Sequence, residues 1–235
     1  MASFPIDEKT ILAVLDWAYD KALTGTPKLE FLRNGMRRLF GGEPPSTAFN
    51  KNMKWASAYE LAETYMQKDL PLEAQVDALV ASQKLKCFTT GFVTGLGGLF
   101  SLPVTIPADV TLTFLLQLRM IAAIAHMGGY TVKDSKVQTL AYACLLGSRM
   151  QELLRTASIA AGQKLTMAVI KKIPAAAITK INQEVGFRLL TKGGEAGILN
   201  MTKALPVVGG LVSGGIDYVA AAGVSKVAKK LFIEP

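Results

Sequence analysis

Residues 87–132 read CFTTGFVTGLGGLFSLPVTIPADVTLTFLLQLRMIAAIAHMGGYTV. The stretch carries only two formal charges, on Asp109 and Arg119, together with the single histidine of the chain, His126. An average soluble domain has about a quarter of its residues charged. Three interpretations fit this shortage of charge: a core hairpin wrapped by amphipathic helices, a re-entrant membrane hairpin, or a lid that opens onto lipid. The first is favoured.

The stretch divides into two apolar helices, expected over residues 88–102 and 110–127, with a kinked connection between them. Pro103 and Pro107 force the bend, because proline disrupts a helix and restricts the residue before it. Neither helix is a convincing membrane span. The second has 18 residues, where a span needs about 20, and Arg119 lies near its centre. Glycine weakens the first as an isolated helix.

The rest of the chain has helical periodicity and no strand pattern longer than a few residues. We therefore predict an all-α fold, a multi-helix bundle in which amphipathic helices surround the central apolar, glycine-rich hairpin. Residues 1–45 are predicted to be an N-terminal helical segment and residues 46–235 the main helical domain, together one compact unit. The other expected helices cover residues 11–23, 29–39, 50–68, 134–155, 174–192 and 206–230.

Charge is distributed unevenly along the 235 residues, whose formal net charge is +8. Residues 1–80 carry 9 Lys/Arg and 11 Asp/Glu, and residues 81–235 carry 17 and 7. The apolar part is therefore also the basic part. That combination suits anionic lipid better than nucleic acid, which is not an expected partner. The alternative is that the lysines only keep a hydrophobic protein soluble.

Three glycines in the first apolar helix form a candidate binding surface. Gly91 and Gly95 are four residues apart, and Gly98 continues roughly the same side. Small residues at this spacing let another backbone approach closely. We take these glycines as candidates to line a slot for an acyl chain, with plain tight packing as the alternative.

Arg119 and His126 are seven residues apart and so share a face of the second apolar helix. Arg119 could hold a phosphate or carboxylate head group while apolar walls hold the tail. The alternative is an arginine that is paired internally, for example with Asp217. Asp109 is expected in the first turn of its helix, where its charge meets the helix dipole. Asp217 is a lone acid in an apolar helix and needs a partner.

Motifs for catalysis and metal binding are missing from the sequence. A zinc site is not indicated, because His126 has no second histidine or cysteine cluster to join. The sequence also lacks a Gly-x-Ser-x-Gly elbow, a phosphate-binding loop and a Rossmann fingerprint after a strand. Catalytic residues are unknown, and no metal or cofactor is expected. Cys87 and Cys144 lie among apolar residues and are predicted to be buried thiols. A disulfide between them is the alternative.

The charged residues among the first ten do not form a secretory signal. We therefore expect the protein in the cytoplasm, at the inner face of the cell membrane when it is membrane-bound.

Several short segments together resemble the EcsC family of bacterial proteins, and the resemblance covers residues 50–232. The resemblance implies a helical protein linked to membrane or secretion biology, and no firmly assigned reaction. The segments are 91–98 (GFVTGLGG), 102–109 (LPVTIPAD), 116–119 (LQLR), 124–126 (IAH), 205–210 (LPVVGG) and 215–218 (GIDY).

We expect a membrane-associated helical protein that binds a lipid or fatty acyl ligand around the 88–127 hairpin. A second hypothesis is a regulatory protein that docks on a membrane transporter without a small ligand. A third is a lipid-modifying enzyme that uses Asp109, Asp217 or His126.

Overall fold

The computed structural model describes residues 8–25, 56–96, 108–159, 164–200 and 206–234. These residues form nine α-helices and one short 3-10 helix, without a strand, which confirms the all-α prediction. The expected helix at 29–39 lies outside the described residues. In chain order the elements are α1 (Glu8–Thr24), α3 (Ala58–Met66), α4 (Leu72–Leu96), α5 (Ala108–Met127), α6 (Ser135–Cys144), η2 (Gly147–Arg149), α7 (Met150–Thr156), α8 (Met167–Lys172), α9 (Ala175–Asn200) and α10 (Pro206–Phe232).

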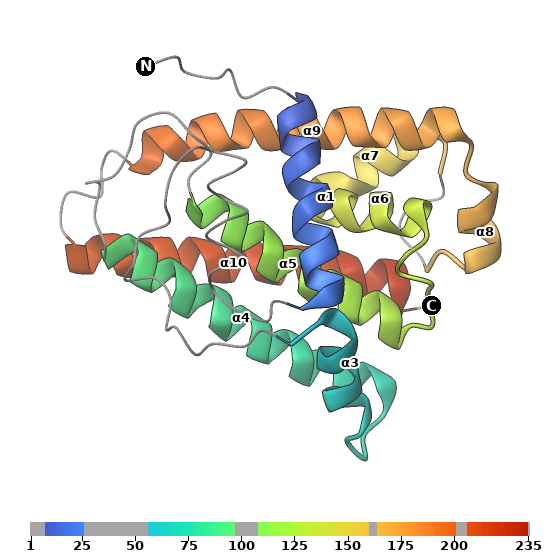
Figure 1. Ribbon diagram of the computed structural model, residues 1–235, viewed down its shortest axis with the longest axis horizontal. Coiled ribbons are helices and arrows are strands. Elements are labelled where there is room, and N and C mark those ends of the chain that lie inside the picture. Colours follow the sequence, from blue (N-terminus) through green and yellow to red (C-terminus); the bar gives the residue numbers. More distant parts are fainter. Residues whose placement is uncertain (1–7, 26–55, 97–107, 160–163, 201–205, 235) are drawn as a thin grey trace.

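Helix α5 is the centre of the bundle. It contacts α1, α3, α4, α6 and α10, and every side chain from Phe114 to Ala125 is buried. Figure 1 shows α5 crossing α10, with α1 in turn crossing over α5. The second arm of the predicted hairpin is therefore a core helix. Its apolar composition follows from neighbours on all sides.

The first arm of the predicted hairpin is the last part of a longer helix, which is a correction to the prediction. Helix α4 begins at Leu72 and continues unbroken past Cys87 to Leu96. The sequence becomes nearly uncharged at Cys87, but no proline lies there to end the helix. α4 also packs on α5, but its most extensive partner is α10. The glycine-rich segment is thus one end of the α4–α10 pair.

Helices α4 and α10 run antiparallel. Near one end, Lys229 Nζ lies 2.6 Å from Asp77 Oδ1. Near the other end, a Cβ atom on Gly214 would lie 2.7 Å from the carbonyl oxygen of Phe88. That separation is too short for any side chain, so Gly214 permits the close approach of the two backbones.

Helix α1 packs on the core through one apolar stripe, as predicted. Ile11, Leu15, Ala18 and Ala22 are buried at helical spacing, and α1 contacts both α5 and α9. The hydroxyl of Tyr19 donates a hydrogen bond of 2.8 Å to the carbonyl oxygen of Val132. α1 therefore belongs to the same core as the helices of the main domain.

Local signals set several helix ends. Ser57 and Glu60 form a reciprocal capping box at the start of α3, so this helix begins later than residue 50. The side chain of Asp134 caps α6, as expected. α5 stops at Met127, where Gly129 has a φ of 84° that favours glycine.

Two further expected helix boundaries were wrong. The helix expected over residues 134–155 is divided into α6, η2 and α7. The division falls at Gly147, which has a φ of 58° that an α-helix does not contain. The helix expected to close at residue 192 continues as α9 through Gly193 and Gly194 to Asn200. Glycine lowers helix stability by only about 1 kcal/mol, which neighbouring contacts can offset.

Candidate functional site

Arg119 is held inside the bundle by α4 and by the segment that leads into α3. Its side chain is 5% exposed. Nη2 donates to Oε1 of Gln83 at 2.9 Å, and Nη1 donates to the carbonyl oxygen of Ala56 at 3.3 Å. Burial lowers the pKa of the guanidinium to about 10, and the nearby Cys87 opposes that shift. The described contacts therefore give Arg119 a role in joining three parts of the core.

His126 lies on the same side of α5, as its spacing from Arg119 predicted. It is partly buried, and its ring meets that of Tyr59 edge to face, with centroids 5.0 Å apart. Tyr59 belongs to α3 and comes three residues after Ala56. The carbonyl oxygen of Ala56 accepts the hydrogen bond from Arg119. The face proposed to hold a lipid head group is thus lined by α3 and α4.

We call Arg119, His126 and their neighbours Ala56, Tyr59 and Gln83 the Arg119 cluster. Cys87 and Asp217 lie near it. The pKa of the Cys87 thiol is raised to about 12, mainly by burial and then by the charge of Asp217, while the charge of Arg119 opposes the rise. Asp217 is partly exposed and stands on α10. The charges of Arg119 and Asp217 therefore both act on the Cys87 thiol, although the two residues are 98 positions apart in the sequence.

The other predicted positions are placed less completely. Gly91 and Gly95 lie in the last turns of α4, and Asp109 is the second residue of α5. Gly98 lies outside the described residues. The proposed acyl slot and the proposed dipole role of Asp109 stay predictions. Among the described residues, no group of three or more His, Cys, Asp or Glu side chains could hold a metal ion.

We expect both cysteines to resist thiol reagents in the native protein. They are free and buried, and burial also raises the pKa of Cys144. A raised thiol pKa leaves less of the reactive thiolate at neutral pH. Labelling with a chromogenic disulfide reagent should be slow in native buffer and complete in denaturant. Rapid native labelling of Cys87 would mean that the Arg119 cluster opens readily.

A surface on α10 was not found by the sequence analysis. Ile216, Tyr218, Val219, Gly223 and Lys226 are all exposed and face outward from the bundle, and we call them the α10 outer face. Ile216 is 50% exposed and Val219 is 69% exposed. Their spacing of three and four residues continues to Gly223 and Lys226, so these four residues form one stripe. The first three have no charge.

The neighbouring helix α4 extends this surface. Lys84 Nζ lies 5.1 Å from the centroid of the Tyr218 ring, a distance at which a cation is attracted to an aromatic face. Leu85, the next residue, is 60% exposed. In the sequence, this surface was indicated only by the low charge of residues 206–225, which contain a single acid. A low charge content alone predicts a buried helix as readily as an exposed one.

The sequence also matches a known family. The profile of the EcsC protein family matches residues 47–233. The chain belongs to the EcsC family. No curated protein and no solved structure matches it.

The EcsC match begins just before α3 and continues to the end of α10, so it includes the Arg119 cluster and the α10 outer face. α1 precedes it. In the described part of this EcsC-family chain, no helix has both the length and the hydropathy needed to cross a bilayer.

Proposed function

We propose that this EcsC-family protein binds peripherally to anionic membrane surfaces through the α10 outer face. The observation that carries the proposal is the exposure of Ile216 and Val219 on one helical stripe that ends in Lys226. Large apolar side chains at helical spacing on a surface are typical of an interaction site. Apolar residues beside lysines suit the boundary between acyl chains and anionic head groups.

Charge complementarity favours a lipid surface as the partner. Lys226 is exposed at one end of the stripe, Lys230 follows one turn later, and Lys84 lies over Tyr218 at the side. Each lysine near an anionic membrane contributes about 1 kcal/mol to binding. The net charge of +8 acts in the same direction at longer range.

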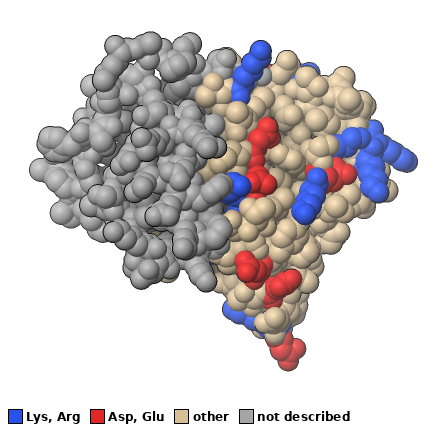
Figure 2. Space-filling model, viewed as in Figure 1, with Lys and Arg blue, Asp and Glu red and all other residues tan. Residues whose placement is uncertain are grey.

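The described part of the face drawn in Figure 2 carries charges of both signs and is a weaker candidate for this role. On the face drawn in Figure 2, acidic and basic side chains of the described residues are interspersed. Such a mixture has little net attraction for an anionic plane beyond the Debye length, about 10 Å at 0.1 M salt. We therefore assign membrane contact to the α10 outer face, where exposed apolar residues and lysines occur together.

The test is co-sedimentation of the full chain with phosphatidylcholine vesicles, with and without phosphatidylglycerol. We expect binding only to the anionic vesicles and weaker binding at high salt. Lys226→Glu should reduce the partition coefficient at least about fivefold, which is the effect of losing one lysine contribution of about 1 kcal/mol. Val219→Glu should reduce it further, because it places a charge where apolar surface meets the acyl chains.

A matched control is Val169→Glu. Val169 is an exposed valine on α8, so the variant makes the same substitution and the same charge change away from the α10 outer face. It should bind vesicles nearly as well as the unchanged protein. An equal loss of vesicle binding in Val169→Glu and Val219→Glu would mean that the change in net charge alone causes the effect. Absence of binding to anionic vesicles would reject a lipid surface and favour a protein partner for this face.

A further inference from the structure

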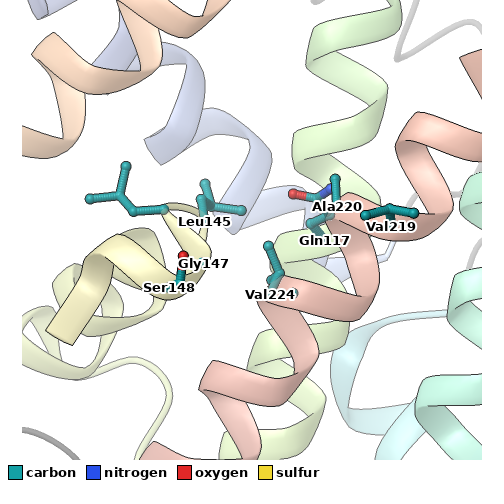
Figure 3. Close-up of a pocket in the computed structure, with 9 residues that line it drawn as sticks. Gln117, Leu145, Gly147, Ser148, Val219, Ala220 and Val224 are labelled. Atoms are coloured by element: carbon teal, nitrogen blue, oxygen red, sulfur yellow. The ribbon is translucent and has the colours of Figure 1, made fainter.

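A small pocket opens between three elements of the bundle. Its volume is about 190 Å³, and its walls come from α5, from the turn between α6 and η2, and from α10 (Figure 3). Gly147 and Gly223 stand on its two sides, and a Cβ atom added to either would find no atom within 4 Å. Two positions without side chains thus leave the space open.

One buried polar side chain reaches this pocket. Gln117 of α5 is 4% exposed and lines the pocket, and Figure 3 shows its amide between Leu145 and Ala220. Within the described part of the chain, the side chain of Gln117 makes no hydrogen bond. The amide atoms of Gln117 are not among the described side-chain atoms that are buried without a hydrogen-bond partner. They are therefore accessible from the pocket, where a molecule from outside the chain can pair with them.

The remaining walls define the chemistry of a ligand. Leu145, Leu146, Val219 and Val224 are apolar, and Ser148 at the exposed edge adds a hydroxyl. None of the described lining residues is charged. An ionised ligand would lose its hydration without gaining an opposite charge, which is strongly unfavourable. A neutral group can instead use the Gln117 amide, which both donates and accepts.

We propose that this pocket binds a small uncharged amphiphile, whose amide, ester or alcohol group pairs with Gln117 while a short aliphatic chain contacts Val219 and Leu145. A water molecule occupies about 30 Å³ of liquid, so the pocket has room for about six waters or for a ligand of similar size. This is a separate site from the Arg119 cluster. It requires no membrane, although Val219 and Gly223 also belong to the α10 outer face.

The test uses hexanamide, hexanoate and hexylamine as probes of the full chain in vesicle-free buffer, followed by ligand-observed NMR. These probes each contain six carbon atoms in a linear chain and differ in charge. We expect saturable hexanamide binding with a dissociation constant on the order of a millimolar. Hexanoate and hexylamine should bind at least about tenfold more weakly, because their charges must be desolvated. Equal binding of all three, or no saturable hexanamide binding, would overturn the proposal.

Two glycine variants on α10 locate the binding. Gly223→Leu places a side chain at the pocket wall and should abolish hexanamide binding. Gly215→Leu is the matched control: its Cβ also meets open space, but Gly215 does not line the pocket. Both variants should fold at least as well as the unchanged protein, because leucine is a better helix former than glycine. Hexanamide binding that persists in Gly223→Leu would assign the signal to another surface and reject the site.

A third variant tests the role of the amide. Gln117→Leu keeps a similar volume and removes the hydrogen-bonding group. It should bind hexanamide at least about fivefold more weakly, which is the effect of one lost hydrogen bond. Unchanged affinity in a folded Gln117→Leu protein would mean that Gln117 does not recognise the ligand. Vesicle binding has a separate readout, so failure of either proposal is distinguishable from failure of the other.

Discussion

Arg119→Ala should lower the free energy of unfolding by about 3 kcal/mol, measured by urea denaturation. The substitution leaves a cavity beside α5 and removes the donors that reach Gln83 and the carbonyl oxygen of Ala56. Both contacts link segments far apart in the chain, so their loss weakens the packing of α3 and α4 on the core. The charge of Arg119 lowers the pKa of the Cys87 thiol, so Arg119→Ala should raise that pKa further and leave less of the reactive thiolate.

Arg119→Met separates packing from hydrogen bonding. Methionine keeps much of the volume and removes a charge that the fold disfavours, because burial lowers the arginine pKa to about 10. That penalty is fully present at neutral pH and fades only as the pH rises through about 10. We expect Arg119→Met to cost at least about 1 kcal/mol less than Arg119→Ala. Arg155→Ala, at an exposed arginine, should change stability by less than about 0.5 kcal/mol. A similarly small change in Arg119→Ala would contradict a role for Arg119 in stability.

Gly214→Ala should destabilise the protein by up to about 2 kcal/mol. The new Cβ would lie 2.7 Å from the carbonyl oxygen of Phe88 and 3.1 Å from its ring, so α4 and α10 must separate. Overpacking of this kind costs about 1–3 kcal/mol, and the better helix propensity of alanine returns about 1 kcal/mol. Thermal unfolding followed by circular dichroism measures the net effect.

Gly215→Ala is the control for this prediction, at the adjacent residue of the same helix. Its Cβ would meet open space, so the variant should gain up to about 1 kcal/mol from helix propensity. The two neighbouring substitutions should therefore have opposite signs. Stabilisation of both would show that α4 and α10 are not closely packed at Phe88.

The sequence predicted those parts of the fold that depend on local chemistry. The stops at Gly128 and Gly129, the cap at Asp134 and the apolar stripe of α1 were all readable, because each depends on residues within one or two turns. Two of the errors in helix boundaries came from glycine. Gly147 breaks a helix by adopting a positive φ, whereas Gly193 and Gly194 remain helical. Glycine permits either conformation, and its surroundings select one.

The candidate site was predictable only in part. Arg119 and His126 could be placed on one face by their spacing, but their neighbours Gln83 and Tyr59 could not. Those contacts depend on how α3 and α4 pack against α5, which involves separations of 36 residues for Arg119 and Gln83. No local pattern encodes such a pairing.

The sequence by itself determined the helical class, the EcsC resemblance and the apolar character of α5 and α10. These follow from composition, periodicity and motif spacing. Only the tertiary structure decided that α5 is surrounded while α10 exposes Ile216 and Val219. Both helices have few charges, and a low charge content is compatible with either environment. The difference arises because neighbouring helices cover α5 on several sides, whereas α4 and α5 leave the outer face of α10 open to solvent.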